Sequence, residues 1–363
     1  MHNSKSIPSK EVLIIGGGLT GVFLAAESLK AGHSVTLIDQ PAPATATRVA
    51  AGLYNIITGR KATLTWQAEL LLETLADFFA LPPFDRLSRY REPYTIYRPF
   101  REPAAYNEWT AKALDPAYAR HVAFSPQERL PEQLHNPLGG LEILPCGWLD
   151  TRGFTAAALE LMKTEMGLIL HRGQMDYAAL QPSTGKANIG GREHVYDEVI
   201  CAEGVRVKDN PWWGWLDIRP LKGQILEVEI PGLELDFVLL RKAFFLPKGN
   251  SFYTVGSTYE KYFKGPGPTA EGIEELSQLI RAAVKLPFRV AEARAGIRPT
   301  TPNRRPVWGR HPEHARLYVL NGMGAKGVLQ APWSAKRMRA WLDGKETPIP
   351  RETGLERFLK KIS

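Results

Sequence analysis

Cysteine is scarce in this chain, and its scarcity argues against a disulfide-stabilised secreted protein. Only two of the 363 residues are cysteines, Cys146 and Cys201, and they form neither a recognisable disulfide framework nor a metal-ligand spacing. The eight histidines show no metal-ligand spacing either. We therefore expect a cytoplasmic protein that holds no metal.

Long apolar runs are also missing, as are two common catalytic motifs. No stretch of about 18 or more uncharged apolar residues is present, so no membrane span is expected. Neither a G-x-S-x-G nor a P-loop motif occurs. The net charge of +8 is spread along the chain, which favours simple solubility over an anionic substrate or nucleic acid. Nucleic acid is therefore an unlikely partner.

A glycine-rich turn follows the first predicted strand. At 363 residues with 44% apolar content, the chain is long enough for two domains with a full core. The run Val12 to Ile15 is typical of a buried parallel strand, and the next residues read G-x-G-x-x-G. Gly16 permits the tight turn, Gly18 lets a pyrophosphate approach the backbone, and Gly21 lets the following helix lie close to the strand.

The second strand of this unit ends in an acid. Residues 22–30 have helical apolar spacing, residues 35–38 form a second buried strand, and Asp39 lies at its carboxyl end. This carboxylate is placed to accept hydrogen bonds from a ribose hydroxyl, and it disfavours NADP, whose 2′-phosphate it would repel. The motif does not distinguish FAD from NAD, and a glycine turn in another βαβ unit is the alternative.

Small residues recur in two later segments. The stretch Arg48 to Gly52 contains two alanines, which let a planar ring system approach closely; a tight packing turn is the alternative. A second glycine-rich turn, Asn321 to Gly327, joins a strand over 317–320 to a helix that ends near Leu342. It would direct a second helix N-terminus at an anion or a developing negative charge.

Between these segments the pattern changes from βαβ to antiparallel. Helices are expected over 64–80 and 155–166 and strands over 168–171 and 195–202, whereas 110–140 reads as loops. Later come alternating strands over 220–230, 237–246 and 251–258 and an amphipathic helix over 272–284. The tryptophans of 212–215 are either core packing, which is favoured, or a lid over a flat ligand.

Taken together, these features resemble the FAD-dependent D-amino-acid oxidase family, which includes glycine oxidase and sarcosine oxidase. The shared landmarks include Gly296-Ile-Arg298-Pro299, Pro306-x-x-Gly309 and Gly322-Met-Gly-Ala-Lys-Gly327. The resemblance covers nearly the whole chain, with 85–145 the poorest match. It implies an α/β fold in which a discontinuous Rossmann-type FAD-binding domain (10–88, 146–210 and 294–345) joins an α+β antiparallel-sheet substrate domain (89–145 and 211–293).

The resemblance also implies a reaction. Such enzymes oxidise a carbon–nitrogen bond of a small amine or amino acid: a hydride passes from the carbon beside the nitrogen to flavin N5, and the imine hydrolyses. Oxygen commonly reoxidises the flavin. No general base is required if the amine is neutral when bound.

Two residues carry the expected catalytic roles. Arg298 aligns with the family arginine that clamps the substrate carboxylate, and a planar guanidinium suits that task; a structural arginine paired with a buried acid is the alternative. Lys326 would serve the reduced flavin or oxygen activation, or point to solvent. The expected cofactor-binding residues are Gly16, Gly18, Leu19, Thr20, Gly21, Asp39, Gln40, Arg48, Ala50, Ala51, Gly52, Ala202, Gly204, Gly296, Arg298, Gly322, Met323, Gly324, Ala325, Lys326 and Gly327.

The chain departs from the family pattern at several positions. Met323 replaces a frequent histidine, and Phe244 and Phe245 occupy the region where some members have a tyrosine. No cysteine or histidine stands in 321–330 to form a covalent link, so FAD is expected to bind non-covalently. The polar residues Arg48, Tyr54, Asn55 and Arg60 suggest a larger or more acidic substrate, or simply a stabilised loop.

Two other functions stay open. A bifunctional tRNA wobble-uridine modification enzyme carries a similar FAD module, so the substrate amine could belong to a modified tRNA base. A non-enzymatic flavin-binding or nucleotide-binding protein is the second alternative. The sequence gives no oligomeric state.

Overall fold

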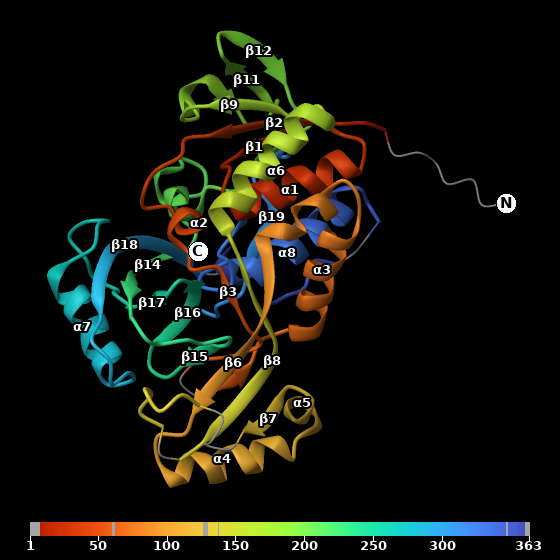
Figure 1. Cartoon of the computed structure of the whole chain (residues 1–363). Helices are drawn as coiled ribbons and strands as arrows, with labels where there is room; N and C mark the ends of the chain where they lie inside the picture. The colour runs from red at the N-terminus through yellow and green to blue at the C-terminus, as the bar shows by residue number, and fades with distance from the viewer. Residues whose placement is uncertain (1–7, 60–61, 126–129, 137, 346–347, 360–363) are drawn as a thin grey trace.

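Two large sheets form the framework of the molecule (Figure 1). The structure is a computed structural model, and it describes residues 8–59, 62–125, 130–136, 138–345 and 348–359. A mainly parallel sheet forms one part, and a larger mixed sheet forms the other.

The parallel sheet contains the amino-terminal glycine motif. Its strand order is β19-β20-β13-β1-β2-β9, and only β19 runs antiparallel to its neighbour. The strands are β1 (Glu11–Ile15), β2 (Ser34–Asp39), β9 (Ile169–Arg172), β13 (Glu198–Cys201), β19 (Val307–Arg310) and β20 (Leu317–Asn321). Residues 12–15 are buried because both faces of the sheet are covered, as their β-branched run predicts.

Helices cover one face of this sheet, and a small sheet covers the other. The helices are α1 (Leu19–Lys30), α3 (Ala68–Ala80), α6 (Thr151–Glu165) and α8 (Gly327–Leu342). The opposite core includes residues of β10 (Leu180–Gln181), β11 (Lys186–Ile189) and η4 (Gly204–Asp209); β12 (Arg192–Val195) completes the small sheet. Trp213 is fully buried in that core, which confirms core packing for this tryptophan.

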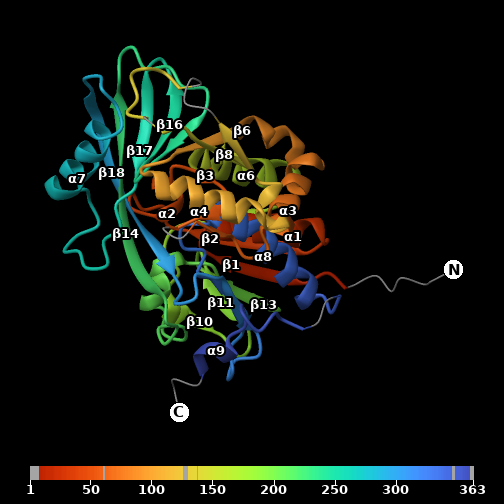
Figure 2. The same ribbon diagram turned by 90° about the horizontal axis from the view of Figure 1, so that it is seen from below.

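The larger sheet is built around long antiparallel pairs. Its order is β18-β14-β17-β16-β15-β6-β8-β3, and β7 pairs with β8. The strands are β3 (Leu53–Tyr54), β6 (Arg91–Pro99), β7 (Val122–Ser125), β8 (Gly140–Leu149), β14 (Arg219–Glu229), β15 (Val238–Leu240), β16 (Phe244–Gly249), β17 (Phe252–Gly256) and β18 (Arg289–Thr300). Helix α7 (Ala270–Arg281) packs on its outer face (Figure 2), and the other face looks toward the parallel sheet.

The remaining elements are short and connect these layers. They are α2 (Ala46–Val49), β4 (Ile57–Thr58), β5 (Thr63–Leu64), η1 (Phe84–Tyr90), α4 (Pro103–Ala113), α5 (Pro116–Ala119), η3 (Tyr177–Ala179) and α9 (Glu356–Leu359). No helix in the described part of the chain is long and apolar enough to cross a membrane. Cys146 and Cys201 are free thiols, and burial raises the pKa of each to about 12.

Several predicted boundaries were wrong. The helix expected over 64–80 begins only at Ala68, because 63–64 pair as β5 and Gln67 adopts a left-handed conformation. The region 110–140, expected as loops, holds the end of α4, α5 and β7. The strand expected over 237–246 is two strands, β15 and β16, joined by a short turn.

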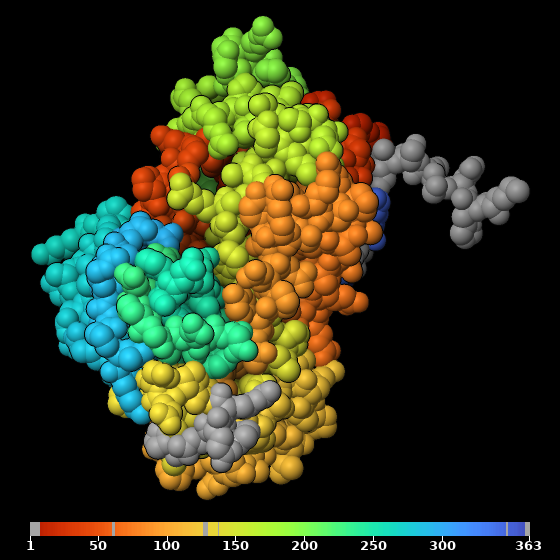
Figure 3. Space-filling view, in the orientation of Figure 1, coloured from red at the N-terminus to blue at the C-terminus, as the bar shows by residue number. Residues whose placement is uncertain are grey.

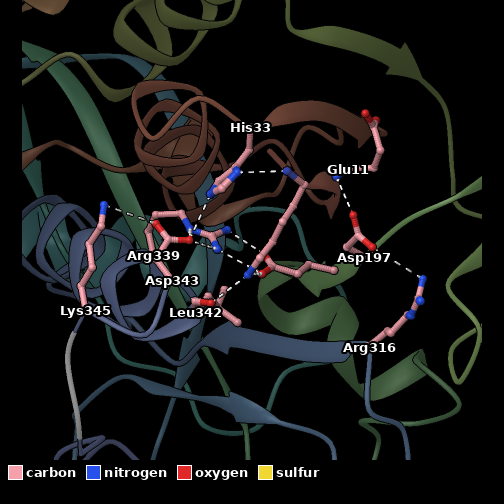
Figure 4. Close-up of polar contacts among 10 residues, drawn as sticks. Glu11, His33, Asp197, Arg316, Arg339, Leu342, Asp343 and Lys345 are labelled. Carbon is pink, nitrogen blue, oxygen red and sulfur yellow. Dashed lines mark hydrogen bonds and ion pairs between the residues drawn. The ribbon is translucent and has the colours of Figure 1, made fainter. Parts of the chain in front are cut away.

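A buried ionic cluster joins the start of the parallel sheet to the end of α8 (Figure 4). The Arg339 guanidinium donates to both oxygens of Glu198, at 2.6 and 3.0 Å, and to Asp343 Oδ1 at 2.6 Å. His33 Nε2 lies 3.0 Å from the same Asp343 oxygen, while its Nδ1 accepts the Lys10 backbone N–H. The ring is therefore neutral with its proton on Nε2, and burial lowers the pKa of His33.

Candidate functional site

The first glycine turn follows β1 and packs tightly against the end of β13 and the start of α1. Gly16 has φ +111°, and a Cβ there would lie 2.5 Å from the Ala202 carbonyl oxygen at the end of β13. A Cβ on Gly21 would lie 1.8 Å from the Gly16 carbonyl oxygen. Both positions therefore require glycine for close packing, in agreement with the roles inferred from the motif.

Helix α1 begins at this turn, and its N-cap residue has no side chain that could cap it. Gly18 is the N-cap and makes no side-chain bond, and the Leu19 N–H donates to Thr47 Oγ1 at 3.1 Å. Thr20 lies in the first turn and is half-buried. The N-terminus of such a helix is suited to a phosphate, because its amides and its dipole both favour negative charge.

Asp39 lies at the carboxyl end of β2, as expected, but it is already engaged. Its Oδ1 accepts the Gly17 N–H at 2.8 Å, and its Oδ2 lies 3.3 Å from Arg172 Nη1. The neighbouring Gln40 accepts a hydrogen bond from Arg206 at 2.9 Å. Sequence reasoning missed Arg172, although the parallel register of β2 and β9 places it directly opposite Asp39.

The second glycine turn connects the two sheets. Asn321 Nδ2 donates to the Gly204 carbonyl at 2.9 Å, and the Gly324 N–H donates to the Pro299 carbonyl at 2.9 Å. A Cβ on Gly327 would lie 3.7 Å from a Leu19 side-chain carbon, so the N-termini of α8 and α1 are neighbours. The turn therefore lies beside the first glycine motif. Met323 is buried, whereas Ala325 is exposed.

The loop of small residues crosses the inner side of β18. The Ile297 N–H donates to the Ala44 carbonyl at 3.2 Å, and a Cβ on Gly296 would lie 2.9 Å from Val49. Gly52 has φ +77° and packs against the Leu149 carbonyl. In Figure 3 the amino-terminal segment, in red, borders the cyan and blue segments of the larger sheet.

The remaining residues of this loop are less constrained. Arg48 and Ala50 are exposed and Ala51 is half-buried. Arg48 has no ion pair among the residues that the structure describes, and Arg60 lies outside the described residues.

Arg298 lies on β18, and no acid in the described part of the chain neutralises its charge. Its Nη2 donates to Ser257 Oγ at 2.7 Å, and its Nη1 lies 3.4 Å from the Thr258 carbonyl oxygen. The ring of Tyr259 is centred 5.0 Å from the guanidinium carbon. No carboxylate pairs with Arg298 in the described parts of the chain, and burial lowers the pKa of its guanidinium. The alternative of a structural arginine held by a buried acid finds no support here.

Lys326 is the N-cap residue of α8, and its side chain points inward. Its Nζ donates to the buried Thr65 Oγ1 at 3.0 Å. Burial, with a smaller contribution from Arg304, lowers the pKa of Lys326 to about 8. The amine therefore titrates just above neutral pH. Thr65 carries no sequence signal that distinguishes it from a loop residue.

Most of the predicted residues thus converge. The two glycine turns meet through α1 and α8, and the Gly324–Pro299 hydrogen bond places the second turn beside the end of β18. Asp39 and Gln40 lie at the end of β2, next to the first turn. Two neighbouring helix N-termini and a glycine-lined contact fit an elongated ligand with a diphosphate and a second electron-rich end.

One histidine-rich cluster lies elsewhere. Ligand atoms of His311, Glu313 and His314 lie within 4.8 Å of one another. Both ring nitrogens of His311 are engaged, however: Nε2 with the Trp212 carbonyl and Nδ1 with the Glu313 N–H, each at 3.1 Å. His311 therefore has no free lone pair for a metal.

Comparisons with known proteins agree with this geometry. The family model described as "FAD dependent oxidoreductase" matches residues 11–341. The tRNA 5-methylaminomethyl-2-thiouridine biosynthesis bifunctional protein MnmC of Idiomarina loihiensis is 29% identical over 154 residues, covering 41% of this chain and 24% of that protein. Glycine oxidase of Geobacillus kaustophilus is 24% identical, covering 93% of this chain and 94% of that protein.

Solved structures share the fold over almost the full length. Iminodiacetate oxidase from Chelativorans sp. BNC1 superposes with a TM-score of 0.77 at 24% identity, covering 94% of this chain and 99% of that one. By contrast, the matches cover only 24–58% of the length of the bifunctional relatives.

Proposed function

Because this chain belongs to the FAD dependent oxidoreductase family, we propose that it oxidises the carbon–nitrogen bond of a small amine that carries a carboxylate. The observation that carries the proposal is Arg298, a half-buried guanidinium without an acidic partner in the described structure. A partly buried cation of this kind is stabilised by a bound anion, and its planar fork matches a carboxylate.

The residues around the two turns fit FAD in this scheme. Gly16, Gly18 and the first turn of α1 would hold the diphosphate, with Asp39 near the ribose, and 321–327 would lie at the flavin ring. Bound FAD supplies the hydride acceptor, and oxygen is the proposed final oxidant. We propose non-covalent binding, because 321–330 contain neither cysteine nor histidine.

The chain's own groups would position the substrate and stabilise negative charge. Arg298 would bind the carboxylate and so fix the reacting carbon. Lys326 and the amides at the start of α8 would favour an electron-rich group at the second turn. In this proposal, strands β14 to β18 bind the substrate and the parallel sheet binds the cofactor.

Two measurements test the proposal. Purified holoenzyme is mixed without oxygen with a panel of amines and amino acids, and loss of the oxidised flavin absorbance identifies a substrate. Arg298→Ala should then raise the KM for a carboxylate-bearing substrate at least about tenfold, equivalent to about 1.4 kcal/mol. Arg219→Ala is the matched control, because Arg219 lies on the adjacent strand, is exposed and pairs with Asp217. An unchanged KM in Arg298→Ala would remove this arginine from the role.

A second candidate substrate is a modified base in tRNA. The similarity to MnmC proteins favours it, and the net charge of +8 leaves it open. Binding of unfractionated tRNA measured between about 50 and 200 mM salt decides the point, since phosphate contacts produce steep salt dependence. Weak binding without that dependence would leave a free amine as the substrate. If neither a free amine nor an amine on a tRNA base reduces the bound flavin, the result would instead favour a non-enzymatic flavin protein.

A further inference from the structure

The Arg298 guanidinium lies between two surfaces of different character. On the inner side is the backbone of Gly223, where a Cβ would lie 2.2–2.4 Å from the guanidinium atoms. On the outer side is the ring of Tyr259, centred 5.0 Å from the guanidinium carbon. Tyr259 is 66% exposed, so its ring lies over the cation without being part of the core.

The segment that contains Tyr259 also binds the edge of the guanidinium. Ser257 Oγ accepts from Nη2 at 2.7 Å, which is the distance that a carboxylate oxygen would take. Residues 257–259 therefore supply both the edge contact and the cover of this cation. A ligand carboxylate would replace the hydroxyl and meet the same aromatic ring.

The buried Gln224 holds both ends of the loop 260–269, which follows Tyr259. Gln224 is fully buried, and its Nε2 donates to Glu260 Oε1 at 2.5 Å and to Thr269 Oγ1 at 3.0 Å. Its Oε1 accepts the Thr269 N–H at 2.8 Å. The buried Lys222 adds an ion pair to Glu260 at 3.2 Å. Both ends of the loop 260–269 are thus anchored, and Tyr259 directly precedes the first anchor.

Most side chains at the tip of this loop, by contrast, are exposed, and only the ring of Phe263 lies near the buried Lys222. Tyr262 is 95% exposed, and Lys261 and Lys264 are exposed as well. The anchoring therefore does not serve to bury the tip. It fixes the position of residue 259 relative to β14 and β18.

We propose that Tyr259 is a specificity-determining cover of the carboxylate site at Arg298, and that Gln224 is the residue that positions this cover. The inference rests on the proposed function of Arg298. By excluding water from one face of the guanidinium, the ring strengthens the bond to a bound carboxylate. Removal of the ring should weaken carboxylate binding, whereas removal of its hydroxyl should not.

Calorimetric titration of the FAD-loaded protein with sodium benzoate tests this, with neutral benzamide as the ligand control. Tyr259→Ala should raise the Kd for benzoate about fivefold to tenfold, and Tyr259→Phe should stay within about twofold of wild type. Tyr262→Ala is the matched control, because it removes an exposed tyrosine from the same loop and should change nothing. Equal effects of Tyr259→Ala and Tyr262→Ala would overturn the proposal, as would wild-type protein that binds no benzoate.

A second variant tests the positioning role. Gln224→Met keeps the side-chain volume but removes the contacts to Glu260 and Thr269, so it should raise the Kd for benzoate and speed tryptic cleavage after Lys261 or Lys264. Faster cleavage with an unchanged Kd would overturn the role of Gln224, and if this variant does not fold, the Tyr259 variants still decide the cover. Amine oxidation is scored separately: holoenzyme that binds benzoate but oxidises no amine refutes the proposed function and leaves the cover intact.

Discussion

Arg298 illustrates what can and cannot be predicted for a single residue. The motif Gly296-Ile-Arg298-Pro299 singled out the arginine, because an arginine in that setting suits a carboxylate. Its surroundings were not predictable, since Gly223 and Ser257 come from other strands and turns and meet it only through the register of the sheet. Sequence patterns identify the charged group, whereas the absence of a neutralising acid is a property of the fold.

Lys326 provides a pH-dependent prediction at the same scale. Its folded pKa is lowered to about 8 from the ordinary 10.5, so it is mostly charged at pH 7 and loses that charge as the pH rises through about 8. We expect the rate at which the reduced holoenzyme reacts with oxygen to fall by about tenfold over that range, equivalent to about 1.4 kcal/mol. Stopped-flow measurement between pH 6.5 and 9.5 checks this.

Substitutions at the same position supply the control. Lys326→Arg keeps its charge over this range and should show a flat profile at the high rate. Lys326→Met should show a flat profile at the low rate. A wild-type profile that persists in Lys326→Met would assign the titration to another group.

At the scale of elements, strands with strong local signals were predicted well. The first strand–turn–helix unit, β9, β14, β20 and α8 lie close to their predicted positions, because their apolar periodicity coincides with their burial. Helix α4 was missed because residues 103–113 bury little apolar surface, with Trp109 their main buried side chain. Strand β15 lies within the strand predicted over 237–246, but its parallel pairing with β6 is a long-range contact without a local signature.

The first turn leads to a prediction at this scale. Gly18→Val should abolish FAD binding, because the new side chain would enter the space expected for the diphosphate and also press on Thr47, whose Oγ1 would lie 3.1 Å from a Cβ. The ratio of flavin to protein absorbance after purification measures the loss. Gly267→Val is the matched control, since a Cβ there meets nothing within 4 Å. A fully flavin-loaded Gly18→Val protein would refute the assignment.

At the scale of the whole molecule, the antiparallel core of the larger sheet was foreseen, but its size was not. The sheet gathers strands from both halves of the chain, from β3 to β18, and such pairing is set by tertiary packing. The ionic cluster around Arg339 could likewise not be predicted, because His33 and Glu198 are 310 and 141 residues away from their partners on α8 and its C-cap. It joins β13 to α8 on the side of the sheet where β1 and β13 begin.

This cluster should govern stability without affecting the site. Arg339→Met would leave Glu198 and Asp343 buried without their main cation, which should lower the free energy of unfolding by about 3–5 kcal/mol. Urea unfolding of the wild type and the variant measures the difference. The Kd for FAD should stay unchanged, because the cluster lies at the opposite end of the strands from both turns. A variant that binds FAD more weakly but unfolds at the same urea concentration would contradict the prediction that the cluster affects stability alone.

Strand β18 has one more consequence for selectivity. It continues from Arg298 to Pro299, whose carbonyl accepts the Gly324 N–H, so under the proposed function the group that binds the acid and the turn expected at the flavin are a fixed distance apart. Inserting one methylene between acid and nitrogen would shift the reacting carbon by about 1.5 Å. A misplacement of about 1 Å can slow a reaction by about 10²-fold. Amino acids that differ by one methylene between acid and nitrogen should therefore differ mainly in turnover and much less in affinity, because the strand fixes the distance between the two sites.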